Sequence, residues 1–166
     1  KAREIWAWIV ITSSHNPLEW NGLKFIIDGR GITEKELEMV KNESNGNRTK
    51  FGTESNGKSD YISEAVQVIG NLEHTKNVTI DIGGGAAKHV GPELLRKIGC
   101  QVTTINDELS NCSRGPDPTT DELTELIHNT KDVGFAFDLD SDRVILVMNG
   151  EKKSSDITPV SYTHLR

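Results

Sequence analysis

The sequence predicts an α/β fold built on a mostly parallel sheet. Two observations lead to this class: from Val78 onwards short apolar runs alternate with helical segments, and turn residues separate them. The runs 78–82, 102–105 and 133–137 are the predicted strands. Strands that alternate with helices are typical of parallel sheets, because each crossover helix returns the chain to the same end of the sheet.

The helices and the last hairpin of this part carry local signals. A helix is predicted around 92–98, and a capping box over Thr119–Glu122 predicts the start of another. The run 144–148 is expected to pair back through Asn149-Gly150, the strongest short hairpin signal. The helical residues expected to face inward are Leu94, Leu95, Ile98, Leu123, Leu126 and Ile127.

The first part of the chain is predicted to hold two strands, a turn and a helix. Residues 5–12 form an apolar run that indicates a buried strand, and residues 23–27 form a second β-prone run. The segment Asp28-Gly29-Arg30-Gly31 is a turn signal. Thr33, with Glu36 three residues later, indicates the N-cap of a helix.

A connector is predicted between these two parts. Residues 41–60 are rich in Asn, Gly, Ser, Lys and Thr, a composition typical of mobile links between domains. The following residues, 61–69, carry apolar side chains at helical spacing and predict a helix.

Composition excludes some classes of function. The chain has 166 residues, a net charge of −6 and a pI near 5.4, so binding to nucleic acid through general electrostatics is not expected. No apolar run approaches the ~18 residues of a membrane span, and no signal segment opens the chain. Cys100 and Cys112 are expected to be free thiols of a cytoplasmic protein.

Three aspartates at alternate positions follow the predicted strand 133–137. Asp138, Asp140 and Asp142 would lie at the carboxyl end of a parallel strand, where ligands gather in such sheets. Two carboxylates ~4 Å apart repel by about 4 kcal/mol at an effective dielectric near 20. Three together therefore need a cation or must spread into solvent, and Mg²⁺ suits an incomplete cage of oxygen ligands. A solvated acidic turn is the alternative for this motif alone.

Two rival sites can be tested on the sequence. A calcium-binding EF-hand requires glycine at the sixth loop position and glutamate at the twelfth, where this chain has Arg143 and Asn149. Phosphatases of the haloacid-dehalogenase type also place Asp-x-Asp after an apolar strand, but continue with Thr or Val where this chain has Asp142. The EF-hand is excluded, and the phosphatase remains a weak alternative.

A polar loop at residues 12–17 reads Thr-Ser-Ser-His-Asn-Pro, and Asn21-Gly22-Leu23-Lys24 follows it. A serine hydroxyl able to carry a phosphoryl group, together with a carboxylate cage for a divalent cation, is the minimum equipment for metal-assisted phosphoryl transfer. Taken alone, the loop is more typical of a plain β-turn than of a phosphoryl carrier.

Together these motifs resemble the α-D-phosphohexomutase family. Its phosphoserine loop, Thr-[Ala/Ser]-Ser-His-Asn-Pro followed by Asn-Gly-x-Lys, is matched by residues 12–24, and its metal loop, Asp-x-Asp-x-Asp-Arg, by residues 138–143. The segment 114–119 resembles the family's Pro-[Glu/Asp]-Pro-Thr lead into a helix. The family usually has Gly-Asn-Gly where this chain has Gly83-Gly84-Gly85. A dinucleotide-binding turn would need glycine at Lys88, so a turn for close strand–helix packing is the better interpretation.

The resemblance implies an activity and a role for each matched residue. The activity is the interconversion of hexose 1-phosphates and 6-phosphates, of glucosamine, mannose or glucose, through a bisphosphorylated sugar. The serine that carries the phosphoryl group is implied to supply an oxygen to the Mg²⁺ held by the three aspartates. The implied catalytic residues are Ser14, His15, Lys24 and Arg143.

The resemblance also implies a four-domain enzyme whose domains are three-layer α/β/α units with mixed sheets. Residues 1–58 would be the end of the first domain and 59–159 the second, while 160–166 look like a translated sequencing adapter. The family's sugar-recognition and C-terminal phosphate-binding loops have no counterpart here. We therefore expect the chain to be part of a longer enzyme and to catalyse no turnover alone. The alternatives are the phosphatase and a non-catalytic module that binds sugar phosphates.

Overall fold

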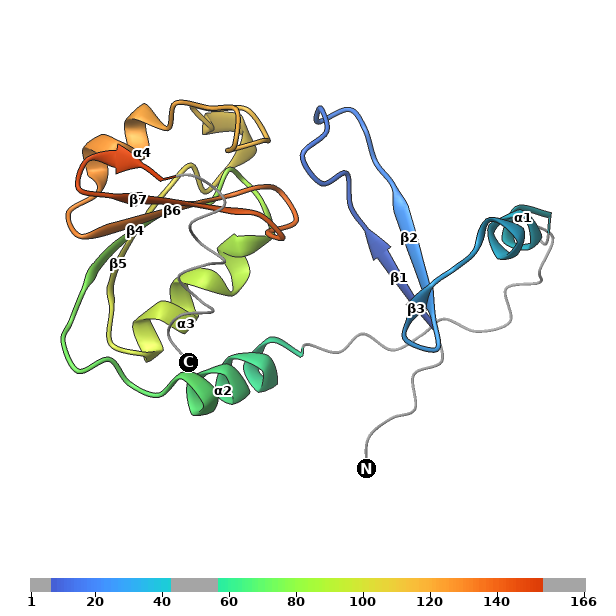
Figure 1. The fold of residues 1–166 in the computed structure, drawn as a ribbon, viewed down its shortest axis with the longest axis horizontal. Helices are drawn as coiled ribbons and strands as arrows, with labels where there is room; N and C mark the ends of the chain where they lie inside the picture. Colours follow the sequence, from blue (N-terminus) through green and yellow to red (C-terminus); the bar gives the residue numbers. More distant parts are fainter. Residues whose placement is uncertain (1–6, 43–56, 154–166) are drawn as a thin grey trace. The chain divides into compact units, whose positions relative to one another are not determined.

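The computed structural model describes residues 7–42 and 57–153, which form two compact units (Figure 1). Among the described residues, 7–12 and 21–42 make up the first unit, and 13–20 and 57–153 make up the second. Most of the predicted connector and the segment 160–166 lie outside the described residues. The domain boundaries proposed at 58 and 159 therefore stay a prediction.

The first unit contains an antiparallel sheet with the order β1-β2-β3. Its strands are β1 (Ala7–Ile11), β2 (Leu23–Ile27) and β3 (Arg30–Gly31). Ile27 pairs with Arg30, so Asp28 and Gly29 are the two central residues of the turn, with φ values of 50° and 76°. Positive φ at both positions is the signature of the type I′ turns that fit the twist of a hairpin, and the predicted turn is confirmed.

Helix α1 (Glu34–Asn42) begins with the predicted capping box. The Thr33 amide donates to Glu36 Oε2 (2.7 Å), and the Glu36 amide donates to the Thr33 hydroxyl (3.3 Å). Arg30 pairs with the same carboxylate at 2.7 Å. Hydrogen bonds from Arg30 and Thr33 hold the pKa of Glu36 well below its usual range. The first turn of α1 is thus stabilised by its own local sequence.

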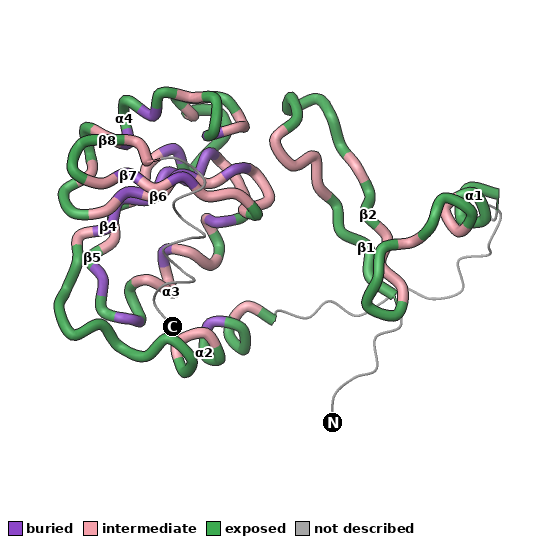
Figure 2. The backbone as a smooth tube through the Cα atoms, viewed as in Figure 1, coloured by how far each residue is buried: buried purple, intermediate pink, exposed green. Residues whose placement is uncertain are grey.

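The predicted burial of the first strand is wrong for this chain. No described residue of the first unit is buried (Figure 2), and Trp8 and Ile9 are 53% and 60% exposed. Successive side chains of a strand point to opposite faces, so both faces of the sheet are exposed at β1. Apolarity indicated a strand correctly, but burial requires a second packed layer, and none covers these strands among the described residues of the unit.

The second unit is built on a mixed five-stranded sheet with the order β5-β4-β6-β7-β8. Strands β4, β5 and β6 are parallel, and β7 and β8 continue antiparallel. The parallel register places Asp81, the last residue of β4, opposite Ile105 of β5 and Ala136 of β6, so three strands end at one edge. The strands are β4 (Asn77–Asp81), β5 (Gln101–Ile105), β6 (Val133–Phe137), β7 (Val144–Met148) and β8 (Glu151–Lys152).

Helices cover both faces of this sheet, which makes a three-layer α/β/α arrangement (Figure 1). Helices α2 (Lys58–Ile69) and α3 (Gly91–Lys97) lie on one face, and α4 (Thr124–Asn129) lies on the other. One cluster of buried residues, which includes Ile80 and Ile98, packs under α3, and a second, which includes Leu126 and Ile145, packs under α4. Short 3₁₀ turns lie at Ala86–His89 and Leu109–Asn111.

The capping box predicted over 119–122 is wrong, although the helix exists. Helix α4 begins at Thr124 with Leu123 at its N-cap, and no side chain makes a capping hydrogen bond there. The Thr119 amide and hydroxyl bond Asp117 Oδ1 instead, at 2.9 and 2.6 Å. The Asp121 carboxylate accepts from the Leu123 amide (2.8 Å), and Leu123 itself is left-handed with φ 54°. The helix therefore begins about one turn later than predicted, because side-chain hydrogen bonds to the backbone hold residues 117–121 in a non-helical conformation.

The last predicted hairpin is confirmed. Met148 pairs with Glu151, and the two residues between them, Asn149 and Gly150, have φ values of 55° and 72°.

Among the described residues, no helix combines the length and apolar character needed to cross a membrane.

The two cores lead to a prediction about stability. Leu126 is fully buried under α4, so Leu126→Ala should lower the free energy of unfolding by about 2–5 kcal/mol through lost burial and a residual cavity. Val68 on α2 is 86% exposed, and Val68→Ala should change it by less than ~0.5 kcal/mol. Urea denaturation of both variants measures the difference. Equal midpoints would mean that α4 does not close a core.

Candidate metal and phosphoryl-transfer site

A cluster of acidic residues lies at the carboxyl ends of β4 and β6 in the second unit. Asp81 ends β4 and is 1% exposed, and the aspartate loop 138–143 follows β6 directly. The Asp81 carboxylate accepts from the Gly83 amide (3.1 Å) and from the Asn106 side chain (3.1 Å). A carboxylate so far from solvent requires such donors and a positive partner.

The positive partner is Arg114, to which the sequence alone assigned no role. Its Nε lies 3.0 Å from Asp81 Oδ2, and both side chains are 2% exposed. Its Nη2 also donates to the carbonyl oxygen of Phe137 (2.6 Å), the residue before Asp138. The resemblance of residues 114–119 to a family motif marked the segment, but pairing with a strand end 33 residues earlier is visible only in three dimensions.

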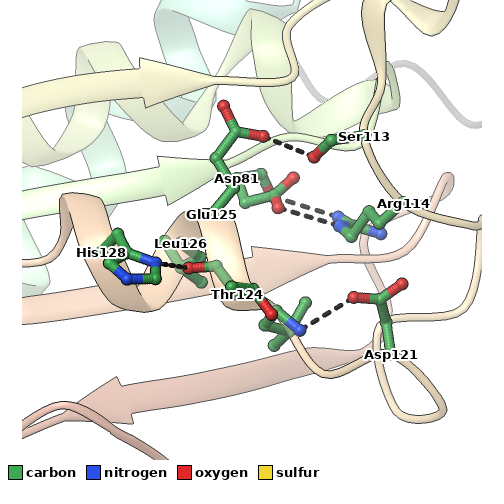
Figure 3. Close-up of a pocket in the computed structure, with 9 residues that line it drawn as sticks. Asp81, Ser113, Arg114, Asp121, Thr124, Glu125, Leu126 and His128 are labelled. Carbon is green, nitrogen blue, oxygen red and sulfur yellow. Dashed lines mark hydrogen bonds and ion pairs between the residues drawn. The ribbon is translucent and has the colours of Figure 1, made fainter.

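A cavity of about 520 Å³ lies between this ion pair and α4 (Figure 3). Most polar side chains that line the cavity interact with one another or with nearby backbone. The Ser113 hydroxyl donates to the Glu125 carboxylate, the Asp121 carboxylate accepts from the Leu123 amide, and Asp81 forms an ion pair with Arg114. His128 hydrogen-bonds the Thr124 carbonyl at 2.8 Å. These contacts account for the polar lining as part of the framework behind the strand ends.

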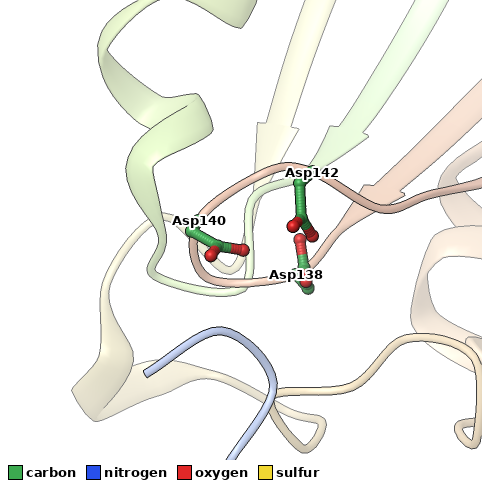
Figure 4. A group of neighbouring side chains, drawn as sticks. All are labelled: Asp138, Asp140 and Asp142. Carbon is green, nitrogen blue, oxygen red and sulfur yellow. The ribbon is translucent and has the colours of Figure 1, made fainter. Parts of the chain in front are cut away.

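The three aspartates of the loop converge, as the sequence predicted. One carboxylate oxygen from each of Asp138, Asp140 and Asp142 lies within 4.8 Å of the others (Figure 4). The loop is closed by backbone bonds from the Asp138 amide to the Arg143 carbonyl (3.4 Å) and from the Ser141 amide to the Asp138 carbonyl (3.2 Å). Ser141 has φ 65°, which reverses the chain within the loop.

Asp138 is the buried member of the cluster, with no exposed surface. Its Oδ1 accepts from the Arg143 amide (3.1 Å), while its buried Oδ2 receives no hydrogen bond from the residues that the structure describes. Burial raises the pKa of Asp138, the Arg143 amide opposes this, and the carboxylates of Asp140 and Asp142 raise it further. Ionised neighbours of this kind accept hydrogen bonds and cannot donate one.

A hard divalent cation fits this donor set. Three carboxylates that converge in this way repel each other unless a positive charge compensates them. One of them is fully buried and has an oxygen that no donor among the described residues reaches. Oxygen ligands are those that Mg²⁺ and Ca²⁺ prefer. The remaining members are less buried, which leaves coordination positions for water or a phosphate oxygen.

The glycine turn at 83–85 packs against the backbone of the aspartate loop. A Cβ on Gly85 would stand 2.6 Å from the Leu139 carbonyl oxygen and 2.8 Å from its Cα. The next amide, of Ala86, donates to that same carbonyl at 2.8 Å. Gly83 has φ 62°, and a Cβ there would lie 2.6 Å from Arg114 Nη2. The close approach that the sequence predicted is therefore real, but it is made with loops rather than with a helix.

The serine loop adopts an unusual backbone conformation at the predicted residue. Ser14 is left-handed, with φ 52°, a region that costs most residues free energy and is often found at functional sites. Its Oγ lies 3.2 Å from His15 Nδ1. The Asn16 amide and side chain both donate to the Ser13 carbonyl, at 3.1 and 2.9 Å. These bonds form a tight turn that presents the Ser14 hydroxyl.

The contacts of residues 13–20 group them with the second unit, which also holds the aspartate loop. Burial acts to raise the pKa of Asp117, but bonds from Thr119 and the charges of His15 and Arg143 hold it below its ordinary value. Ser14 and His15 are half-buried. His15 and Arg143 thus share one electrostatic neighbour, Asp117, which the sequence did not single out.

The other predicted residues are placed as follows. Arg143 directly precedes β7, and its amide bonds Asp138. Lys24 lies on β2 of the first unit, where it pairs with Val10 and its side chain is exposed. The structure brings the three aspartates together and places Ser14 beside His15. The catalytic roles assigned to these residues remain predictions.

Known proteins provide an independent comparison. Residues 59–151 match the family model described as phosphoglucomutase/phosphomannomutase, alpha/beta/alpha domain II. Similar relatives are a probable phosphoglucosamine mutase from Methanothermobacter thermautotrophicus, 31% identical over 85% of this chain, and a phosphomannomutase/phosphoglucomutase from Pseudomonas putida, also 31% identical over 85%. The chain spans 34% and 33% of their lengths, about a third.

A solved structure resembles the fold. A phosphoglucomutase/phosphomannomutase family protein from Burkholderia thailandensis superposes with a TM-score of 0.71 and 26% identity, over 91% of this chain and 35% of that protein.

The turn beneath the aspartate loop leads to a second prediction. Gly85→Ala should lower the free energy of unfolding by about 1–3 kcal/mol, because the new methyl group meets the backbone of Leu139, which cannot rotate away. Gly115→Ala is the matched control, since no atom lies within 4 Å of a Cβ there, and should cost less than ~1 kcal/mol. Chemical denaturation compares them. Equal stability of both variants would contradict the close approach.

Proposed function

Because the chain belongs to the phosphoglucomutase/phosphomannomutase family, we propose that it is part of a hexose-phosphate mutase, an isomerase that moves a phosphoryl group between the 1- and 6-positions of a sugar. The observation that carries this proposal is that the segment matched by the family model contains the converging aspartates 138, 140 and 142. The names of the relatives support glucosamine, mannose or glucose phosphate as the substrate class.

Asp138, Asp140 and Asp142 would hold the divalent cation, for which we propose Mg²⁺. The buried Oδ2 of Asp138 supports this assignment, because it receives no hydrogen bond from the described part of the chain. When bound, the cation offsets negative charge on the phosphoryl oxygens during transfer. An oxygen of phosphorylated Ser14 is the proposed fourth ligand.

Ser14 is the proposed phosphoryl carrier. A sugar hydroxyl oxygen attacks the phosphorus of phospho-Ser14, a new O–P bond forms, and the bond from phosphorus to Ser14 Oγ breaks as the hydroxyl proton leaves to a base. The sugar is then bisphosphorylated, and the reverse step at its other phosphate restores phospho-Ser14. Positioning and electrostatic stabilisation supply most of the rate in such transfers. The left-handed backbone of Ser14 supports a presented hydroxyl.

The remaining residues have distinct proposed tasks. His15 orients the serine, which its contact of 3.2 Å with Ser14 Oγ supports. Arg143 binds phosphate through its planar guanidinium. Lys24 neutralises phosphate or exchanges the proton of the sugar hydroxyl.

Metal binding can be tested on the chain itself. Mg²⁺ at about 100 times its dissociation constant should stabilise the fold by about 2.7 kcal/mol and raise the melting temperature. Asp138→Asn should abolish this shift. It should also raise stability at neutral pH without Mg²⁺, because the raised pKa of Asp138 means that its ionised form destabilises the fold.

Thermal unfolding with and without Mg²⁺ measures both effects. Asp107→Asn, which changes an exposed carboxylate of the same unit, is the control and should keep the wild-type shift. An undiminished Mg²⁺ shift in Asp138→Asn would rule out the aspartate site.

The carrier role can be tested in the longer protein that we propose contains this chain. Intact-mass spectrometry should find one phosphoryl adduct, which Ser14→Ala loses, and mutase turnover should fall at least about a thousandfold. Ser13→Ala is the control and should keep the adduct, with turnover reduced less than about tenfold. An adduct that persists in Ser14→Ala would reject the assignment. Phosphate release independent of Ser14 would favour a phosphatase.

A further inference from the structure

Arg114 joins three segments of the second unit through separate nitrogens. Its Nε lies 3.0 Å from Asp81 Oδ2 at the end of β4, its Nη2 donates to the Phe137 carbonyl at 2.6 Å, and its Nη1 donates to the Gly115 carbonyl at 3.0 Å. The planar guanidinium fixes the positions of these nitrogens relative to one another. One side chain therefore holds two carbonyl oxygens by hydrogen bonds, and the Asp81 carboxylate by an ion pair, in one geometry.

The Phe137 carbonyl is the point at which this geometry reaches the aspartate loop. The ladder between β4 and β6 ends at the pair Asp81 and Ala136, so Phe137 lies one residue beyond it. Arg114 Nη2, which also lies 3.4 Å from the Asp81 carbonyl, provides the donor that a longer β4 would have provided. The carbonyl that it fixes belongs to the peptide that leads into Asp138.

The absence of a side chain at Gly83 leaves room for the Arg114 guanidinium. Gly83 is left-handed, and a Cβ there would overlap Arg114 Nη2 at 2.6 Å. Both charged side chains of the Asp81–Arg114 pair are 2% exposed. A buried ion pair contributes little net stability compared with apolar residues of similar volume, so net stability does not explain this arrangement. Its consequence is the fixed geometry of the strand ends.

We infer that Arg114 is a positioning residue for the metal site, holding the Phe137 carbonyl so that the Asp138 carboxylate faces its two partners; this rests on the proposed Mg²⁺ site. Residues that orient metal ligands from outside the coordination sphere typically change metal affinity 10–100-fold when altered. Arg114 touches no reacting group in this proposal and acts only through the loop.

Calorimetric titration of the 166-residue chain with Mg²⁺ tests the inference. Arg114→Lys keeps the charge but cannot reach three acceptors, and should weaken Mg²⁺ binding at least about tenfold. The double variant Asp81→Asn with Arg114→Met removes both buried charges, which favours folding, and should weaken binding to a similar extent. Circular dichroism establishes that each variant is folded.

Val147→Ala controls for lost stability, because Val147 is fully buried and pairs with Gly134, at the opposite end of β6 from Phe137, and should leave the Mg²⁺ affinity within about threefold of wild type. Wild-type affinity in Arg114→Lys or in the double variant would overturn the inference. A loss of affinity in Val147→Ala equal to theirs would overturn it as well. A wild-type chain that binds no Mg²⁺ would instead reject the metal site itself.

Discussion

Repulsion among three carboxylates at one strand end is the constraint around which the second unit is arranged. Asp138 is fully buried, and its pKa is raised by burial and then by its two acidic neighbours. Such a loop needs a rigid support, or it would turn its carboxylates outward into solvent. The support comes from the backbone bonds of the loop, the glycine turn beneath it and the Arg114 side chain behind it.

The aspartate loop and the serine loop differ in how the rest of the fold supports them. Parallel pairing of β4, β5 and β6 places three strand ends at one edge, and the two cores on either face hold that edge in place. The serine loop has no such core. It relies on a tight turn around Ser14, whose left-handed backbone costs free energy that the flanking bonds of Ser13 and Asn16 offset. A cation at the aspartates would give this loop a partner of opposite charge when the serine carries phosphate.

Features specified by neighbouring residues were predicted well from the sequence. The turns at Asp28-Gly29 and Asn149-Gly150 and the Thr33–Glu36 capping box formed as expected, since each depends on two or three adjacent side chains. The capping box at Thr119–Glu122 failed because Asp117 accepts from the Thr119 amide, which the Glu122 side chain would have bonded, and Asp121 binds the Leu123 amide just before the helix. The burial of β1 failed because apolarity indicates a preference for burial and not the presence of a covering layer.

The α/β class and the strand that leads into Asp138, Asp140 and Asp142 follow from periodicity and spacing, which are local properties of the chain. The serine motif is identified by its resemblance to the phosphohexomutase family, which likewise depends only on neighbouring residues. The burial of Asp138 within the carboxylate cluster and the bridge that Arg114 makes from Asp81 to Phe137 depend on the tertiary structure. These two contacts of Arg114 join residues more than 20 positions apart, and the parallel register of the sheet, not the local sequence, brings such residues together.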